Sequence, residues 1–346
     1  MFDLVGHFLT SVSAFSQLPM FSVGWVIFLI AACITFAVKV AASEVKFGPK
    51  AFIQHCFPGQ SLKDKSTVMD AVMYSVSKMT KAVVLIGHYG LIIAVSSGVS
   101  FILNRYVPAI QQTPTALGLI AVAIVACLVW DFSNFLSHYL QHKVPFLWEI
   151  HKVHHSATQL TPFTAKRLHP LADKLDLTIG GVLVGIVFGL TQHFLTLSVP
   201  LMLMMLGNIN MVVTVLALDP LRHSSVGVSF GPLEGLLVSP KMHHLHHSVE
   251  RSHWDKNMGF AFGIWDIMFG TYMKPEKGAV YAYGIGRGAE EDEKYQNLVG
   301  AYIDPVRAAI AVAIHVPDGS EDVMTPALQL RLKKLVAARA LATAQA

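Results

Sequence analysis

The chain has 346 residues, of which 53% are hydrophobic and only 14% are charged, and its formal net charge is +4. Soluble domains carry about 25% charged residues, so this composition favours an integral membrane protein. No basic run typical of a nucleic-acid contact is present, and the three cysteines lack the spacing of a metal or disulfide motif. The net charge is therefore informative mainly through where the individual charges lie.

Five apolar segments are long enough, or nearly so, to cross a bilayer core of about 30 Å. They cover residues 21–42, 83–103, 116–137, 175–190 and 197–218. The fourth is near the lower length limit, and its short connection to the fifth predicts a hairpin. The sequence thus predicts an all-α membrane protein with about four to five transmembrane helices.

Lysine and arginine are distributed unevenly between the loops that join these segments. The 43–81 loop holds six lysines, whereas the 104–115 connection, the 191–196 turn and the first twenty residues together hold only Arg105. Because cytoplasmic loops carry the excess of basic residues, the 43–81 loop is predicted to be cytoplasmic. The same topology places both histidine-rich regions, described next, in a cap on the cytoplasmic side.

Histidines cluster in three motifs, which read HYLQH at 138–142, HKVHH at 151–155 and HHLHH at 243–247. Spacings of three and four residues put imidazoles on one face of a helix, about 5–6 Å apart at Cβ. Neutral imidazole is a ligand for iron, zinc, copper and nickel. A single tetrahedral zinc takes four ligands, so this larger number predicts two metals. The predicted ligands are His138, His142, His151, His154, His155, His243, His246 and His247.

The position of these motifs beside apolar spans indicates the chemistry. A site that opens toward lipid meets C–H bonds and few carbonyl groups, which favours a redox metal and oxidation over hydrolysis. Asp131 lies seven residues before His138, nearly two helical turns, and is expected to accept the second ring N–H of a ligand histidine. His169, His253 and Asp255 are further candidates for positions beside the ligands. His244 is expected at the surface or in a loop.

The motifs resemble, in order, the HxxxH, HxxHH and HxxHH boxes of the fatty acid hydroxylase / sterol desaturase superfamily, which are membrane non-haem di-iron oxidoreductases. Other segments with similar order are KRLHP (166–170), RHSSV (222–226), HWDKNMG (253–259) and WDIMFGTY (265–272). The second resembles a Gln-His-Ser-Asn element with a metal histidine, which implies His223 as a ninth ligand. Arg222 and Ser225 replace the Gln and Asn expected there. The resemblance covers about residues 120–275.

This resemblance implies two iron ions, O2 as co-substrate, and hydroxylation or desaturation of a sterol-like or fatty acyl lipid in lipid biosynthesis. It also implies an external electron donor, namely a ferredoxin, a cytochrome or a flavoprotein reductase. No internal donor site is expected, because GIGRGA at 284–289 lacks the strand and helix that flank a dinucleotide fingerprint.

Two other functions stay open at this point. One is a catalytically inactive relative that binds lipid or regulates another protein. The other is a membrane electron carrier with bis-histidine haems, for which only His88 and His193 lie within or beside spans.

Three regions are predicted along the chain. Residues 1–115 form an N-terminal membrane region with two spans and a basic loop, 116–275 the catalytic domain, and 276–346 a cytosolic tail. Within the tail, residues 276–320 are expected to be irregular and 326–346 helical.

Overall fold

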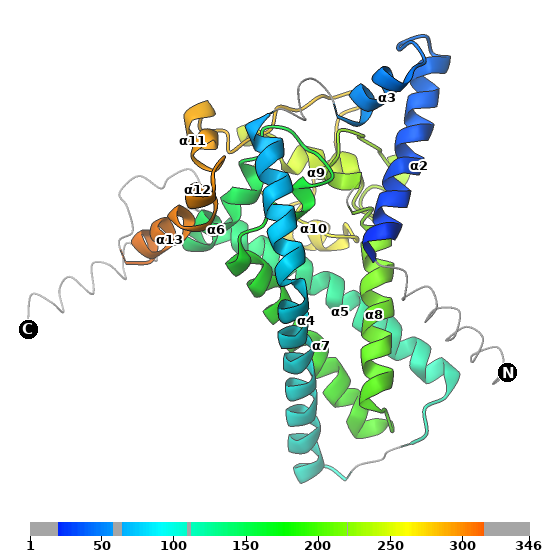
Figure 1. Ribbon diagram of the computed structural model, residues 1–346. Helices are drawn as coiled ribbons and strands as arrows, with labels where there is room; N and C mark the ends of the chain where they lie inside the picture. The colour runs from blue at the N-terminus through cyan, green and yellow to red at the C-terminus, as the bar shows by residue number, and fades with distance from the viewer. Residues whose placement is uncertain (1–19, 58–63, 109–111, 220, 315–346) are drawn as a thin grey trace, which may run out of the picture.

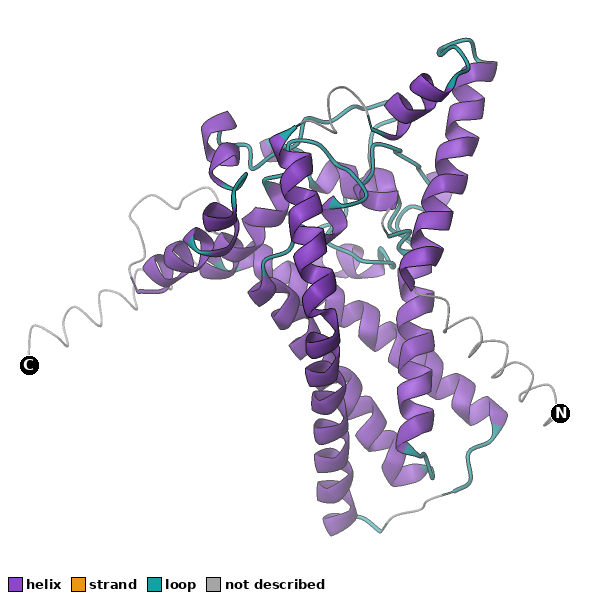
Figure 2. Cartoon of the chain, viewed as in Figure 1, coloured by secondary structure: helices purple, strands orange, loops and turns teal. Residues whose placement is uncertain are grey.

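A computed structural model describes residues 20–57, 64–108, 112–219 and 221–314 of the chain. Within these ranges the regular structure is helical, and β-pairing is limited to isolated bridges (Figures 1 and 2). The predicted all-α class is therefore confirmed. The long helical segments at residues 83–106, 116–137, 170–194 and 199–216 form one end of the molecule. The short helices and loops gather at the other end, beside the long helix of residues 20–41, and we call this end the cap.

The helices have the following bounds. The long ones are α2 (Met20–Ala41), α4 (Lys65–Tyr106), α5 (Ala116–Lys143), α7 (Pro170–Phe194) and α8 (Val199–Leu216). The short α-helices are α3 (Pro49–Cys56), α6 (Pro145–His155), α9 (Pro240–His246), α10 (Ile264–Phe269), α11 (Ala289–Lys294), α12 (Leu298–Tyr302) and α13 (Asp304–Ile314). The 3-10 turns are η2 (Thr164–Lys166), η3 (Leu221–His223), η4 (Gly231–Leu233) and η5 (Arg251–His253).

Three of the described helical segments are long and apolar enough to cross a membrane, and they identify an integral membrane protein. They are Val83–Tyr106 within α4, Ala116–Lys143 and Pro170–Phe194. Two shorter apolar segments, Val26–Ala41 and Pro200–Leu216, belong to α2 and α8. The predicted number of four to five spans counts these two as well and stays a prediction.

Two helices extend beyond their predicted apolar segments for local reasons. α7 begins at Pro170, whose missing N–H suits the first helical position, and the His169 ring caps it by accepting the N–H of Leu171 at 3.1 Å. α5 continues past Ser137 to Lys143. It therefore carries the first histidine box directly from the span into the cap.

α4 and α7 pack closely because small residues line one face of α7. Gly181, Gly185 and Gly189 recur every four residues, which places them on one helix face. A Cβ added to Gly189 would lie 2.6 Å from the carbonyl oxygen of Ser96 and 2.6 Å from Cβ of Val99. Small residues of this kind let helix backbones approach each other in membranes.

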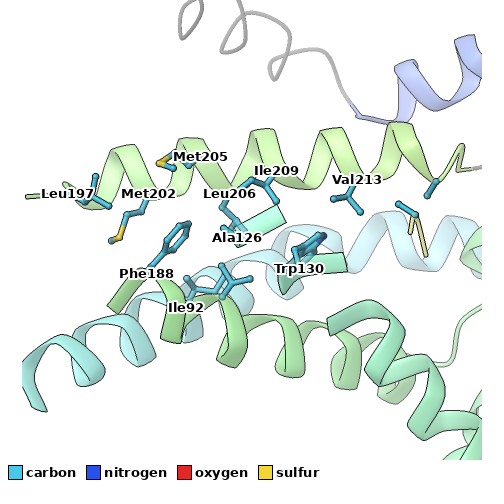
Figure 3. Packing of buried hydrophobic residues seen from close by; sticks show 13 residues of the cluster. Ile92, Ala126, Trp130, Phe188, Leu197, Met202, Met205, Leu206, Ile209 and Val213 are labelled. Carbon is cyan, nitrogen blue, oxygen red and sulfur yellow. The ribbon is translucent and has the colours of Figure 1, made fainter. Parts of the chain in front are cut away.

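α8 packs its apolar side on α5 and α7. Met202, Met205 and Leu206 of α8 are buried with Trp130 of α5 and Phe188 of α7 (Figure 3). This arrangement assigns the methionine-rich run of α8 mainly to core packing. The membrane region thus consists of an α4–α7 pair and an α5–α8 pair, joined through α5 and α7.

The chain after residue 276 is more ordered than expected. Three short helices, α11 to α13, lie within the segment predicted to be irregular, and α13 packs along α6 of the cap. That prediction is therefore wrong for residues 289–314. The physical reason is that α13 buries Ala309 against Ile150 and Ala172, a contact that local composition does not reveal. The helix expected at 326–346 lies outside the described residues.

Arg167 joins three distant segments inside the cap. Its side chain is fully buried and forms an ion pair with Asp70 of α4 at 2.9 Å. It also donates to the carbonyl oxygens of Val153 in α6 (2.8 Å) and Tyr295 after α11 (3.2 Å). Ser156 Oγ accepts two further N–H groups at 2.9 and 3.2 Å. One guanidinium thus fixes the end of the second histidine box relative to α4 and the C-terminal segment.

We predict that Arg167→Lys lowers the free energy of unfolding by about 1–3 kcal/mol, because the lysine ammonium keeps the charge but cannot replace all the donors of the planar guanidinium, which leaves buried acceptors unpaired. The measurement is thermal unfolding in detergent. Arg307→Lys is the matched control, since Arg307 lies exposed on α13 with one carboxylate partner, Asp304. Equal midpoints for the two variants would contradict the role given to Arg167.

We predict that Gly189→Ala destabilises the α4–α7 pair by about 1–3 kcal/mol, because the new methyl group would overlap backbone. Gly207→Ala in α8 is the control, since no atom lies within 4 Å of the position of its added Cβ. The control should be neutral or slightly stabilising, because alanine favours helix over glycine. Unfolding midpoints of both variants, measured in the same detergent, test this difference.

Candidate metal centre

Nine histidines converge in the cap as two adjacent groups. Within each group the ligand atoms all lie within 4.8 Å of one another. Group A consists of His138, His142, His151, His155 and His246. Group B consists of His154, His223, His243 and His247. The structure thus brings together every histidine named as a ligand by the boxes and by the resemblance, and each group can hold a metal ion.

Helix geometry divides each HxxHH box between the two groups. In α6, His151 and His155 are four residues apart and point to group A, whereas His154 points to group B. In α9 the assignment is reversed, because His243 and the following His247 belong to group B. Two residues four positions apart share a helix face, whereas the remaining histidine of each box, His154 or His246, points away from that face. Each box can therefore supply ligands to both metals.

The ring nitrogens that face the centre of each group are the Nε2 atoms. All five Nε2 atoms of group A are buried and have no hydrogen-bond partner. In group B the Nε2 atoms contact only each other, at 2.8 Å between His223 and His243 and 3.1 Å between His243 and His247. Buried polar atoms normally have partners, and the shared partner that suits converging lone pairs is a metal cation.

In four of the five group A rings the Nδ1 atom faces an acceptor, which favours the tautomer that leaves Nε2 free. The carbonyl oxygens of Met258 and Lys256 accept from His138 (2.8 Å) and His246 (2.7 Å). Gln141 Oε1 accepts from His151 at 3.0 Å. Asp255 Oδ1 lies 3.4 Å from Nδ1 of His142. Such partners orient metal-binding rings and raise their basicity.

Group B has a different electrostatic environment. Asp219 Oδ1 lies 3.4 Å from Nδ1 of His223. His243 Nδ1 instead lies 2.8 Å from Nη2 of Arg222. The same nitrogen donates to the carbonyl oxygen of Gly259 (3.1 Å), and Nη1 of Arg222 donates to that of Phe260 (2.7 Å). The substitution of Arg for the expected Gln therefore places a buried cation against one ring of this group.

Two buried carboxylates hold the loop that follows the third box. Asp131 accepts the N–H groups of Ala261 (2.8 Å) and Phe262 (3.2 Å) and the indole N–H of Trp265 (2.8 Å). Asp266 accepts the N–H of Met258 at 2.8 Å. The expectation that Asp131 receives a histidine N–H is therefore wrong. It acts instead on the loop whose carbonyl oxygen orients His138.

The remaining candidate histidines lie outside both groups. His169 caps α7 and bonds to the carbonyl oxygen of Tyr302 at 3.0 Å. His253 lies 3.5 Å from Glu250 and packs against the ring of Tyr281. His244 is buried rather than exposed, which corrects the surface assignment, and burial lowers its pKa to about 3. Among the residues proposed beside the ligands, Asp255 alone contacts a ring of group A or B.

Sequence reasoning missed Gln141, Asp219 and Arg222 as partners of the histidines. Asp219 stands four residues before His223, a spacing that brings side chains together on a helical turn and could have identified it. Gln141 precedes His142 directly, so its contact with His151 required knowledge of how α6 folds back on α5. Pro145 begins α6 after a single residue outside helix, which produces that reversal.

Burial keeps the grouped histidines of the second and third boxes neutral. It lowers the pKa values of His151, His154 and His155 well below the ordinary range, and the neighbouring imidazoles add to the effect. The same causes act on His246 and His247. Burial also lowers the pKa of Arg222, to about 10, so the guanidinium remains charged at neutral pH. Neutral rings whose Nδ1 donates a hydrogen bond therefore offer a free Nε2 lone pair to metal at pH 7, whereas the Arg222 donor leaves the proton of neutral His243 on Nε2.

A cavity of ≈ 330 Å³ reaches the histidines from the membrane side. Its lining includes Val84 and Leu85 at the start of the α4 span, Leu206 of α8, and His138 and His243 from the two groups. This volume is typical of a small-molecule site. The cavity is thus lined both by residues of the helices long enough to cross a membrane and by histidines of the two groups.

Comparison with known proteins supports the same reading of the boxes. Residues 123–271 match the family model described as "Fatty acid hydroxylase". This segment contains all nine grouped histidines. The resemblance to the fatty acid hydroxylase / sterol desaturase superfamily is thereby confirmed. No solved structure matches the chain.

Three curated relatives carry names of lipid-oxidising enzymes. Ornithine lipid hydroxylase OlsE of Rhizobium tropici is 26% identical over 175 residues, which is 51% of this chain and 47% of that protein. Alkylglycerol monooxygenase of Caenorhabditis elegans is 28% identical over 162 residues, or 46% of this chain and 29% of that protein. The human alkylglycerol monooxygenase is 28% identical over 163 residues, or 44% and 30%. The chain spans about half or less of the length of these relatives.

We predict that the metal-free protein loses stability as the pH falls below about 6.5, the ordinary histidine pKa. Above that pH the imidazoles are neutral in both states. Below it the unfolded chain binds protons that the buried rings do not, because their folded-state pKa values are lowered, so the free energy of unfolding decreases. Chemical denaturation of chelator-treated protein across this pH range measures the effect. A pH-independent midpoint would contradict it.

Proposed function

Since its central segment, residues 123–271, belongs to the fatty acid hydroxylase family, we propose that this chain is an integral membrane oxygenase that uses O2 and two iron ions to hydroxylate a lipid. The observation that carries the proposal is the cavity that opens from the membrane region and is lined by histidines of both groups. The names of the relatives support lipids as substrates and hydroxylation rather than desaturation.

The donor set fits iron. One ion would be held by the five imidazoles of group A and the other by the four of group B. Imidazole ligands suit iron, and sets without thiolate are compatible with oxygen chemistry. Iron bound there would supply the redox chemistry that directs O2 at a C–H bond. The chain's own residues would bind the lipid, orient the histidine rings and shield the site from water.

The residues around the histidines perform those tasks. The Met258 and Lys256 carbonyl oxygens, Gln141, Asp255 and Asp219 keep the ring protons on Nδ1 and the ring planes fixed. A preorganised set of ligands avoids reorganisation during the reaction. The buried packing of both groups excludes bulk water, so the cavity supplies the main route for a lipid.

We further propose that the centre faces the cytoplasm and receives electrons from an external ferredoxin, cytochrome or flavoprotein reductase. The excess of lysine in the 43–81 loop supports this orientation. An external donor is required because the reduction of O2 consumes electrons that the nine imidazoles cannot supply. Convergence of all nine histidines argues against an inactive lipid-binding relative, since such a protein has no need for two intact donor sets.

We predict that the purified protein contains about two irons per chain, one for each donor set. His154→Ala should remove iron from group B and His246→Ala from group A, and both should abolish oxidation of membrane lipids. Elemental analysis gives the metal content, and mass spectrometry of lipids from cells with and without the gene gives the product.

His55→Ala is the matched control, because His55 lies on α3 and bonds to Thr35, outside both groups. It should retain iron and activity. Folded wild-type protein that binds no metal, or lipid oxidation that survives both box substitutions, would refute the proposed function.

A further inference from the structure

The cavity is polar where it meets the histidines, which is unusual for a site that takes a lipid. Charged side chains of both signs line it. They are Lys78, Lys166, Asp173, Asp176, Asp219 and Arg222. Asp219 and Arg222 are engaged with His223 and His243. The other four have no role in holding the histidine rings directly, and we call them the ionic collar.

The ionic collar lies at the boundary of the membrane region. Asp173 and Asp176 occupy the first two turns of α7, three residues apart and therefore on one side of the helix. Lys78 stands five residues before the α4 span that begins at Val83, and Lys166 ends η2 in the loop opposite. Charged residues at such depth are costly and face cavities or partners.

Two members of the collar have unused binding capacity. Within the described ranges, the carboxylate of Asp173 and the ammonium of Lys166 form no hydrogen bond or ion pair, although both line the cavity. Lys166 lines the cavity together with Asp173 and Asp219. A cation and an anion thus face the same space without neutralising each other in an ion pair.

Asp176 connects the collar to the metal centre. Its Oδ1 accepts from Ser137 Oγ at 2.5 Å and from Gln141 Nε2 at 2.7 Å. Gln141 in turn accepts from the group A ligand His151 at 3.0 Å. No hydrogen bond to Oδ2 occurs among the described residues, and Asp176 lines the cavity. Asp176 therefore lies two hydrogen bonds from a metal-binding ring, and a ligand group bound to Asp176 would lie three from it.

We propose that the ionic collar binds the head group of a zwitterionic lipid, one that carries both a protonated amine and an anionic group. The amine lies at Asp173 and Asp176, and the anion lies at Lys166 and Lys78. The acyl chains extend past Val84, Leu85 and Leu206 toward the bilayer. This proposal rests on the proposed function and adds that oxidation falls in or next to the head group, because the collar adjoins the histidines.

A neutral lipid fits this cavity less well for a physical reason. The charges of Asp173 and Lys166, which form no described ion pair, lose hydration in this partly desolvated space, and a ligand of complementary charge restores the lost interactions. A purely anionic head group would meet Asp173 and Asp176, and a neutral one would leave both signs unpaired. Selectivity for a head group thus has two sources: attraction of the collar to complementary charges, and the free-energy cost of binding a head group without them.

The test measures binding, so it needs neither iron nor O2. Native mass spectrometry of the full chain in detergent compares three probes with the same acyl chain: lysophosphatidylethanolamine, lysophosphatidylglycerol and monoacylglycerol. We expect the zwitterionic probe to bind about five- to tenfold more tightly than either other probe. Equal binding of all three, or preference for the neutral probe, would overturn the proposal.

Asp176→Asn removes the charge while the amide oxygen can still accept from Ser137 and Gln141, and Asp173→Asn alters no described contact of the side chain. Each should reduce binding of lysophosphatidylethanolamine toward the level of monoacylglycerol. Asp304→Asn on α13, far from the cavity lining, is the control and should keep the preference. Unchanged preference in both cavity variants would overturn the proposal.

The two proposals fail separately. If iron-dependent oxidation acts on a neutral lipid and the probes bind equally, the proposed function stands and the ionic collar is not a head-group site. If the zwitterionic probe is preferred and no oxidation is found in iron-loaded protein, the head-group site stands without the reaction. In active protein, an added oxygen located by tandem mass spectrometry in the middle of the acyl chain would also count against the collar.

Discussion

The constraint on which the cap depends is the burial of nine imidazole nitrogens that point at one another. Five Nε2 atoms in group A have no partner, and those of group B contact only each other. Protonation is opposed by burial and by mutual repulsion. A shared cation satisfies such lone pairs without adding charge to the rings. Folding of the cap and binding of metal are therefore expected to be coupled.

Holding so many rings together requires support that lies outside the boxes. Arg167 ties the end of the second box to α4 and to the segment after α11. Asp131 and Asp266 hold the loop that presents the Met258 carbonyl oxygen to His138. Each of these groups is buried and has several partners, so its cost of desolvation is offset by hydrogen bonds. The metal centre is thus positioned by a buried polar frame rather than by apolar packing alone.

The membrane region positions the cap relative to lipid. α5 passes from the span into the first histidine box without interruption, and the glycine face of α7 brings α4 close on the other side (Figure 1). The cavity between the helix pairs joins apolar walls to the ionic collar and the histidines. This gradient of polarity along one cavity is the basis of our proposal that the head-group end of a lipid, and not its terminal methyl, binds beside the histidines.

The sequence by itself determined the class of fold, the membrane character and the eight histidines of the three boxes, because helical periodicity and box spacing are local properties of the chain. The ninth histidine, His223, followed only from the resemblance of its segment to the family. The sequence also placed Asp255 beside the ligands. The tertiary structure alone decided which histidine joins which group, since this depends on how α6 and α9 are rotated relative to α5. It likewise assigned Asp131 to the 261–265 loop, buried His244, ordered residues 289–314, and brought Gln141 and Arg222 against ligand rings. These contacts join residues far apart in the chain, so they cannot be predicted from local composition or spacing.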